Sequence, residues 1–319
     1  MQPIEAPSLA DIRRAAERLD PSARHTPLIP LQHPGPQRIW LKLENLQPIG
    51  SFKLRGAGNA LALTAPARLR AGVSTASAGN MAQGVAWDAR RRGIPCRVVV
   101  PDHAPAAKIR AVEALGAEVI AVPFAVWWTA LVDGGLPGIP GEFIHPVCDG
   151  RVVAGNGTIA LELDAEVAEF DAVVAPFGGG GLSCGIAAAL RCLRPEVAVY
   201  GAEVATAAPL AASWSAGEPR EVSYTPSFVD GIGGKSVLAP MWPLARSLLA
   251  GSLVVELEEV AAAVRLLVRH GRVVAEGAAA AAVAAALRGI PGRQRIVCIV
   301  SGGNIDSSTL CALLEGRLP

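Results

Sequence analysis

Short apolar runs and helix-like segments alternate along the chain, and this alternation constrains the fold more than any other feature. The apolar runs lie at 39–43, 73–76, 96–101, 119–122, 172–176, 197–201 and 295–300. Helical patterns separate them, at 9–19, 53–63, 80–92, 106–115, 124–133, 157–169, 181–193, 258–270 and 275–287. Strands that are apolar on both faces and joined through helices form parallel sheets. The sequence therefore predicts an α/β fold of two open, mostly parallel twisted sheets with helices on both faces.

Composition excludes several classes of protein. The 319 residues are about half hydrophobic with a net charge of +1, so a large core is expected and nucleic-acid binding is not. The longest apolar run, 277–287, is too short to cross a bilayer, so no membrane partner is expected. The N-terminus carries no secretory pattern. The six cysteines form no C-x-x-C pair, which indicates buried thiols in a cytoplasmic protein.

A glycine-rich loop follows the apolar run 172–176. Ligands of parallel α/β folds bind at the carboxyl ends of strands, and glycines let backbone amides approach a phosphate closely. No Gly-Lys-Ser/Thr follows, and the third glycine of a dinucleotide motif is absent. Glu203, after the next strand, could bind a ribose, so a nucleotide-binding loop is the weaker alternative. The other alternative is a tight turn that binds no ligand. The loop glycines are Gly178, Gly179, Gly180 and Gly181.

Two further loops combine serine, glycine and asparagine after a strand. Residues 77–80 precede a helix, where amides and the polar groups of Ser77 and Asn80 would bind a substrate carboxylate. Residues 301–304 place the neutral hydroxyl of Ser301 at the end of the last strand. Ordinary N-capping and an ordinary strand-to-helix turn are the alternatives for these two loops.

Lys53 is one of four lysines against twenty-five arginines. A lysine can lose its proton and attack a carbonyl to form a Schiff base, which an arginine cannot do. The alternatives are a solvated surface lysine and a lysine content that only reflects a GC-rich genome.

These motifs together resemble the serine/threonine dehydratase and serine racemase family, which are pyridoxal-phosphate enzymes of fold type II. The resemblance covers nearly the whole chain and rests on four motifs in the family's order. The motifs are NLQPIGSFKLRGA at 45–57, SAGN at 77–80, GGGGL at 178–182 and SGGN at 301–304.

The resemblance implies a role for each motif residue. Lys53 would carry the cofactor as a Schiff base and remove the substrate Cα proton, with Ser77 as the second catalytic residue. Phe52 would pack beside the cofactor ring, Asn80 would bind its hydroxyl and Ser301 its nitrogen. The four loop glycines would bind its phosphate. The residues expected around the substrate are Ser77, Ala78, Gly79, Asn80 and Met81.

The implied activity is removal of water and ammonia from a serine- or threonine-like amino acid to give a 2-oxo acid. The alternatives are an amino-acid racemase, a β-replacement enzyme, and a cofactor-binding protein whose catalysis has been lost or repurposed. The resemblance also implies a large domain of residues 1–70 plus 147–319, a small domain of residues 71–146 that closes over the site, and a homodimer.

Several positions depart from the family pattern. Ala78 stands where racemases carry an acid/base serine, which favours dehydration over racemisation. Met81 replaces a usual histidine and allows a bulkier or more apolar substrate. Glu203 matches one carboxylate of the family's divalent-cation site, but Pro209 replaces the second, so no metal is expected. Trp127 and Trp128 are either core residues or part of a lid over the substrate.

Overall fold

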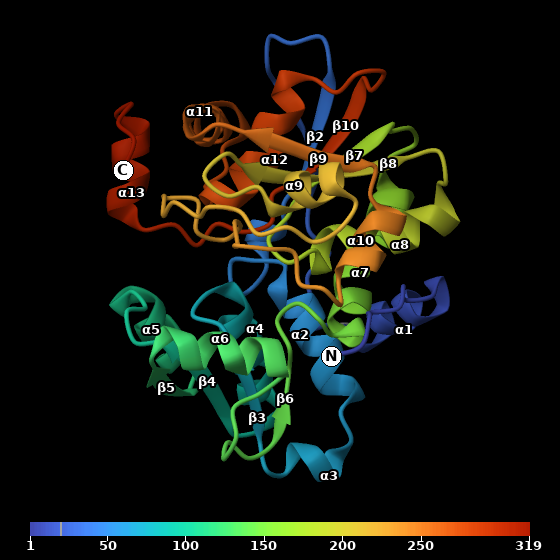
Figure 1. Cartoon of the computed structure of the whole chain (residues 1–319). Coiled ribbons are helices and arrows are strands. Elements are labelled where there is room, and N and C mark those ends of the chain that lie inside the picture. Colours follow the sequence, from blue (N-terminus) through green and yellow to red (C-terminus); the bar gives the residue numbers. More distant parts are fainter. Residues whose placement is uncertain (20) are drawn as a thin grey trace.

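Two separate sheets form the framework of the computed structural model, which describes residues 1–19 and 21–319 (Figure 1). The larger sheet has the order β1-β2-β10-β7-β8-β9, in which β1 is antiparallel to β2 and the other pairs are parallel. The smaller sheet, β5-β4-β3-β6, is parallel throughout. The prediction of two mostly parallel sheets is confirmed. The strands are β1 (Leu28–Leu31), β2 (Arg38–Lys42), β3 (Val73–Ala76), β4 (Cys96–Pro101), β5 (Glu118–Val122), β6 (Glu142–Phe143), β7 (Ala172–Pro176), β8 (Ala198–Val204), β9 (Gly251–Val255) and β10 (Arg295–Ile299).

Helices cover both faces of the larger sheet. Their bounds are α1 (Leu9–Leu19), α2 (Lys53–Leu63), α3 (Pro66–Leu69), α4 (Asn80–Arg92), α5 (Ala106–Glu113), α6 (Phe124–Asp133), α7 (Gly150–Glu166), α8 (Gly181–Leu193), α9 (Pro209–Ala216), α10 (Trp242–Leu248), α11 (Leu257–Leu266), α12 (Gly277–Arg288) and α13 (Ser307–Leu314). A 3-10 turn, η1 (Glu44–Leu46), follows β2, and a π turn, η2 (Leu267–Gly271), extends α11.

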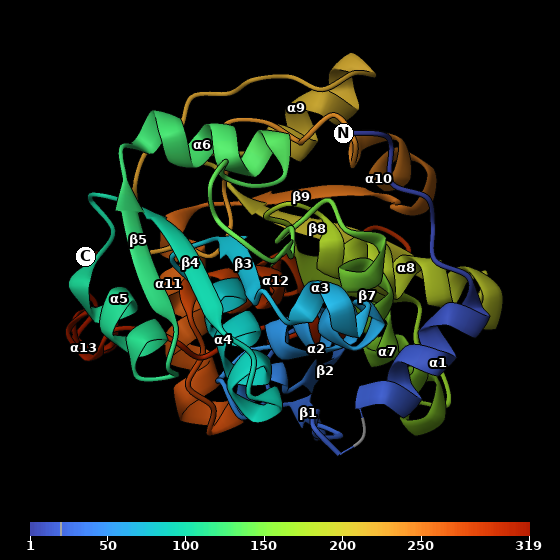
Figure 2. The ribbon, with the colours of Figure 1, turned by 90° about the horizontal axis from the view of Figure 1, so that it is seen from below.

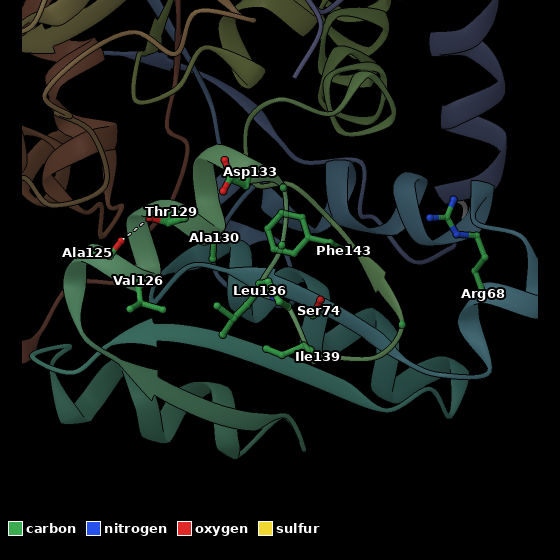
Figure 3. Close-up of a pocket in the computed structure, with 14 residues that line it drawn as sticks. Arg68, Ser74, Ala125, Val126, Thr129, Ala130, Asp133, Leu136, Ile139 and Phe143 are labelled. Carbon is green, nitrogen blue, oxygen red and sulfur yellow. Dashed lines mark hydrogen bonds between the residues drawn. The ribbon is translucent and has the colours of Figure 1, made fainter.

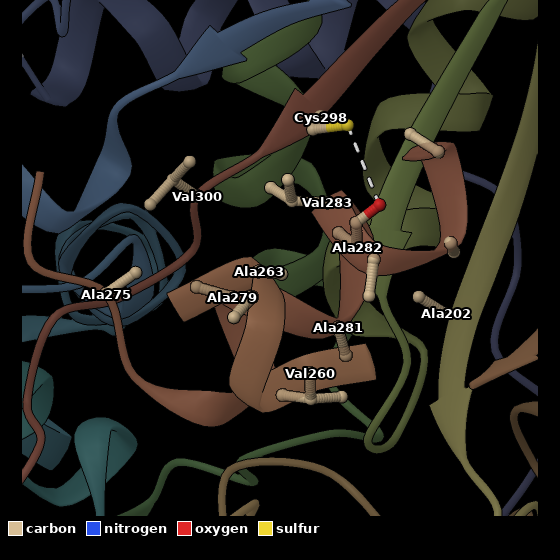
Figure 4. Packing of buried hydrophobic residues seen from close by; sticks show 14 of the residues in the cluster. Ala202, Val260, Ala263, Ala275, Ala279, Ala281, Ala282, Val283, Cys298 and Val300 are labelled. Carbon is tan, nitrogen blue, oxygen red and sulfur yellow. Dashed lines mark hydrogen bonds between the residues drawn. The ribbon is translucent and has the colours of Figure 1, made fainter. Parts of the chain in front are cut away.

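Alternate side chains of β7 enter two different cores. Ala172 and Val174 pack with α11 and α12, whereas Val173 and Ala175 pack with α7 and α8. Successive strand residues point to opposite faces, so a strand buried on both sides must be apolar at every position. Helix α12 is almost entirely alanine and is buried nearly all round, because small side chains let it lie close to the sheet (Figure 4).

Helix α2 joins the two sheets. Its residues Ala57, Ala60 and Leu61 belong to the core of the smaller sheet, together with residues of α4 and β4. Its other side packs against α7 of the larger part, and α2 lies between the two sheets in Figure 1. Seen from below, α4 crosses β3 and β4 beside α2 (Figure 2). Any residue at the start of α2 is therefore held by both halves of the molecule.

Several elements differ from the sequence prediction. Helix α7 begins at Gly150 rather than at residue 157, because Asp149 accepts a hydrogen bond from Arg151 N and caps it. The sequence did not predict a helix here because the first half of α7 is rich in glycine, which lowers helix propensity. The elements that the prediction missed altogether are β1, β6, β9, α3, α9, α10, α13 and η1.

The described helices include none that is long and apolar enough to cross a membrane. Four cysteines are buried as expected, whereas Cys192 and Cys311 are exposed.

Candidate active site

One cavity of about 400 Å³ lies between the two sheets and collects every site residue that the sequence predicted. The carboxyl ends of strands from both sheets point toward it, as expected for parallel α/β folds. Its lining includes Phe52, Lys53, Ser77, Ala78, Gly79, Asn80, Met81, Gly178, Gly179, Gly180, Gly181 and Ser301.

Lys53 is the first residue of α2, and the neighbouring strands β2 and β10 place it. Phe52 N donates a hydrogen bond of 3.0 Å to Ser301 O, and Ser51 forms an antiparallel bridge with Gly302. The loops after β2 and β10 are thereby joined, so Lys53 and Ser301 line the same cavity. The Lys53 Nζ lies 5.1 Å from the centre of the Phe52 ring.

The four-glycine loop connects β7 to α8 on another wall of the cavity. Gly180 has a φ of 93°, and a Cβ at Gly179 would lie 2.4 Å from the Val147 side chain. Larger residues are therefore excluded at both positions. The loop leads into α8, whose first backbone N–H groups have no partner within the helix. Such a helix start favours a bound anion.

Close helix contacts fix the distance between Lys53 and the glycine loop. A Cβ at Gly155 of α7 would lie 2.3 Å from the Arg55 carbonyl oxygen on α2. A Cβ at Gly185 of α8 would lie 2.4 Å from the Val153 carbonyl oxygen on α7. The three helices therefore touch backbone to backbone, and they hold the start of α2 against the start of α8.

The third wall is the start of α4. Gly79 N donates a hydrogen bond of 3.2 Å to Ser77 Oγ, which shapes the turn before the helix. Ala78 and Gly79 present no polar side chain to the cavity, and Met81 is buried. The N-terminal N–H groups of α4 are available to a carboxylate.

Glu276 is a cavity residue that the sequence analysis did not select. It is 7% exposed, and Asn80 Nδ2 donates to its two carboxylate oxygens at 2.9 and 3.0 Å. Asn80 Oδ1 accepts in turn from Asn304 Nδ2 at 2.8 Å. The available signal was the segment Glu276-Gly277-Ala278-Ala279, which resembles a Glu-Gly-Ala-Gly segment of the family.

Burial perturbs both ionisable groups at the centre of the cavity. Desolvation lowers the pKa of Lys53 to about 8, partly opposed by the charge of Glu276. Desolvation also raises the pKa of Glu276 to about 7, partly opposed by the hydrogen bond from Asn80. The lowered pKa increases the fraction of Lys53 that is a neutral amine near neutral pH, and the neutral amine is the nucleophilic form.

Aromatic residues form part of the cavity wall. Phe124 and Trp127 come from α6, with ring centres 5.6 Å apart, and Tyr224 comes from the segment before α10. Trp127 Nε1 is buried and has no hydrogen-bond partner among the described residues. Lys108 of α5 forms an ion pair with Asp230, which joins the two halves of the molecule at this side.

The geometry at Glu203 does not suit a metal ion. Its Oε1 accepts from Leu210 N at 2.8 Å, and its Oε2 accepts from Ala211 N at 2.8 Å and from Ser252 Oγ at 2.6 Å. The carboxylate thus caps the start of α9. A cluster of His25, Glu162 and Glu166 offers three ligand atoms elsewhere. The Lys42 ammonium lies 2.8 and 3.0 Å from its two carboxylates and already supplies a positive charge.

A second cavity of about 680 Å³ lies on the other side of α6. Figure 3 shows Val126, Leu136, Ile139 and Phe143 around it. None of the predicted site residues lines this cavity. Helix α6 therefore separates it from the central one.

Comparison with known proteins agrees with this geometry. A family model described as "Pyridoxal-phosphate dependent enzyme" matches residues 19–302. L-threonine ammonia-lyase of Thermotoga maritima is 38% identical over 284 residues, covering 88% of this chain and 70% of that protein. Serine racemase of Dictyostelium discoideum superposes with a TM-score of 0.86 at 30% identity, over 95% of this chain and 100% of that one. Threonine deaminase isoform 2 of Solanum lycopersicum, in its processed form, gives 0.84 at 30% identity, over 98% and 90%. The chain belongs to the family of pyridoxal-phosphate dependent enzymes.

Proposed function

We propose that the protein is a pyridoxal-phosphate dependent ammonia-lyase that converts a serine- or threonine-like hydroxy-amino acid into a 2-oxo acid. Its relatives include proteins named threonine ammonia-lyase and threonine deaminase. The observation that carries the proposal is the central cavity. The buried amine of Lys53, whose pKa is lowered, lines this cavity. The glycine loop at the start of α8 and Asn80 at the start of α4 line the same cavity.

The cavity fits pyridoxal phosphate in three respects. Lys53 can bond to an aldehyde, because its pKa of about 8 leaves neutral amine available. The glycine loop lines the cavity and carries no side chains that would shield its backbone N–H groups from a phosphate. Ser301 offers a neutral hydroxyl, which suits an unprotonated ring nitrogen. Phe52 would pack beside the ring and Asn80 would bind its hydroxyl.

When bound, the cofactor supplies an aldehyde that condenses with amines and a ring that delocalises electrons from the substrate Cα. Lys53 Nζ, as a free amine, would accept the Cα proton as a general base. Ser77, Gly79 and the N–H groups at the start of α4 bind the substrate carboxylate and orient the Cα–H bond toward Lys53. The proton taken from Cα would return to the departing β-hydroxyl, which leaves as water. The resulting enamine takes up a proton on Cβ to become an imine, and water hydrolyses the imine to the 2-oxo acid and ammonia.

The residue at position 78 favours dehydration over racemisation. Racemisation needs a second group that returns a proton to the opposite face of Cα, and an alanine methyl cannot transfer one. We therefore expect 2-oxo acid formation to exceed racemisation of the same substrate. Chiral analysis of recovered substrate, beside a 2-oxo acid assay, measures both rates; racemisation as the faster reaction would refute this assignment.

Borohydride reduction tests the role of Lys53 directly. Reduction of the protein purified with its cofactor, followed by proteolysis and mass spectrometry, is expected to place a pyridoxyl group on Lys53. The chain's three other lysines are internal controls within one sample. A label on Lys42, Lys108 or Lys235 instead would remove the basis of the proposal.

A panel of hydroxy-amino acids, read by 2-oxo acid formation, would identify the substrate. The panel should pair serine and threonine with analogues that carry larger apolar groups on Cβ, because Met81, Phe124 and Trp127 line the cavity. The absence of 2-oxo acid from every member would favour a β-replacement or a repurposed binding role.

Two broader assignments complete the proposal. Residues 71–146 would act as a small domain that closes over the cavity, supported by the location of all strands of the smaller sheet within this range. By resemblance to its family, the protein would act in the cytoplasm as a homodimer. Light scattering of the purified protein would then give twice the mass of one chain.

A further inference from the structure

We propose that the second cavity, behind α6, binds a small molecule with a branched apolar chain and a cationic amine head group, and that the bound molecule stabilises α6, which also forms part of the wall of the central cavity. No step of the proposed dehydration uses the second cavity. The inference therefore goes beyond the proposed function and does not depend on it.

Incomplete cover of the smaller sheet creates this cavity. Successive side chains of β4 point to opposite faces, so Val98 packs in the core beside α4 whereas Val99 packs in the core beside α6. The core beside α6 has four buried members, which are Ala76, Val99, Ala130 and Leu131. The space that they leave is a cavity of about 680 Å³, which is within the usual size range of small-molecule sites.

Much of the cavity wall is apolar. Leu136 and Ile139 come from the Gly- and Pro-rich segment 134–141, and a hydrogen bond of 3.2 Å from Ile139 N to Leu136 O closes the turn between them. Val126 of α6 and Phe143 of β6 complete the apolar surface (Figure 3). Such a surface suits a branched hydrocarbon chain, which is stabilised by leaving water.

A polar side chain interrupts this apolar surface. Ser74 of β3 is 4% exposed and lines the cavity beside Phe143, its register partner on β6. Its hydroxyl makes no hydrogen bond with any other residue that the structure describes. The hydroxyl can therefore accept a hydrogen bond from the head group of a ligand, either directly or through a bridging water.

The charge around the cavity favours a cation. Asp133 is the last residue of α6 and lines the cavity, and the last turn of this helix contains no basic residue. The carbonyl end of a helix carries partial negative charge, so a carboxylate there is unfavourable until a cation approaches. Among residues 1–19 and 21–319, none forms an ion pair with Asp133, whereas Arg68, the other charged lining residue, lies 2.7 Å from Glu142 Oε2. An ammonium group would balance the remaining negative charge.

Helix α6 presents one face to each cavity. Val126, Ala130 and Asp133 are spaced by four and three residues, as on one side of a helix, and line the second cavity. Phe124 and Trp127 line the central cavity instead. Because the core beside α6 has few buried members, local opening of this helix should need little free energy. A molecule that fills the second cavity therefore stabilises the wall that Phe124 and Trp127 form.

Two probes of the same shape and opposite charge test the site in the protein purified with its cofactor. Dimethylisopentylamine is a cation at neutral pH and, as a tertiary amine, cannot condense with the aldehyde of pyridoxal phosphate. Isocaproate has the same branched chain with a carboxylate in place of the amine. Isothermal titration calorimetry should show saturable binding of one amine per chain, and isocaproate should bind at least about 10-fold more weakly. Absence of saturable amine binding at millimolar concentrations would overturn the proposal, as would equal binding of the two probes.

Two substitutions locate the bound amine. Asp133→Asn should weaken its binding by about 10-fold or more, and the fold should remain because the change removes an unfavourable charge from the helix end. Ala125→Phe, at an exposed lining position, places a ring in the cavity and should abolish binding.

Glu113→Gln is the matched control. Glu113 is the exposed last residue of α5, in the same part of the molecule, and lines neither cavity. Its substitution should leave the affinity for the amine unchanged. An affinity equal in Asp133→Asn and wild type, or retained in Ala125→Phe, would overturn the assignment of the amine to this cavity.

Hydrogen exchange tests the effect on α6. At an amine concentration about 100 times the dissociation constant, exchange of the α6 amides through local opening should slow by about 100-fold in wild type. At the same concentration the slowing should be about 10-fold smaller in Asp133→Asn. Unchanged exchange in α6 with the amine bound would refute the stabilisation of this helix.

Neither measurement uses a substrate. A failed dehydratase assay would therefore leave the second site standing, and a failure of the amine to bind would leave the dehydratase proposal standing.

Discussion

Replacing Gly155 by alanine should displace the start of α2. The new Cβ would lie 2.3 Å from the Arg55 carbonyl oxygen and 2.9 Å from Gly56 Cα, whereas ordinary contact begins near 3.4 Å. Both obstacles are backbone atoms, which cannot rotate away. The two helices must therefore separate by about 1 Å at this crossing.

The expected magnitude combines two opposing terms. Overpacking in a close-packed region costs about 1–3 kcal/mol. The better helix propensity of alanine returns at most about 1 kcal/mol. We expect Gly155→Ala to lower the free energy of unfolding by about 1–2 kcal/mol. A displacement of about 1 Å between the nucleophile and its binding groups also lowers kcat by about 100-fold.

Gly150→Ala is the matched control, because it makes the same change at the start of the same helix with nothing within 4 Å of the added Cβ. It should leave both the unfolding midpoint and kcat close to wild type, or raise the midpoint slightly. Urea unfolding and initial rates of 2-oxo acid formation compare the two variants. Equal midpoints and equal kcat values for both would refute the idea that backbone contact between α2 and α7 positions Lys53.

Three further outcomes follow from the structure. Chelators and added divalent cations should leave activity unchanged, and activation by a divalent cation would contradict the assignment of Glu203 as a helix cap. Glu203→Gln should lower the free energy of unfolding by about 2 kcal/mol, because an amide cannot accept from Ala211 N and Ser252 Oγ as the carboxylate does. Burial lowers the pKa of His145 to about 4, so neutral His145 stabilises the fold above pH 6.5, and this contribution falls as the pH drops from about 6.5 toward 4. Its full size is about 3 kcal/mol, and His145→Gln should flatten the pH dependence of unfolding over that window. Trp127→Ala should raise kcat/KM for substrates with a large apolar group on Cβ, relative to serine, by about 10-fold or more; an unchanged ratio would remove Trp127 from substrate selection.

The central framework could be predicted from the sequence because its signals are local. Strands such as β4 and β7 are apolar at every position, and each is followed by a loop with an obvious chemical character. Parallel pairing then brings those loops to one side of the sheet. These loops carry the binding groups, and the resemblance of their motifs to a known family is what predicted one site for Lys53, Asn80 and Ser301, which line one cavity.

The parts that escaped prediction depend on distant partners. Strand β9 is only half buried and lies at the edge of the sheet, so its apolar signal is weak. The start of α7 is rich in glycine, and its helical form depends on contact with α2 and α8 rather than on propensity. The contacts of Glu276 with Asn80 and beside Gly302 could not be predicted, because they join segments that are far apart in the sequence.

The adjacency of β2 and β10 has a consequence for how the enzyme acquires its activity. These two strands stand near opposite ends of the sequence, and their pairing joins the loop of Lys53 to the loop of Ser301. Contacts between such distant segments form late and slowly, since a long loop must close first. A nascent chain therefore exposes Lys53 long before it can hold a cofactor correctly. Cofactor binding should therefore begin only at the last step of folding. During refolding, recovery of cofactor binding should lag behind recovery of helical structure.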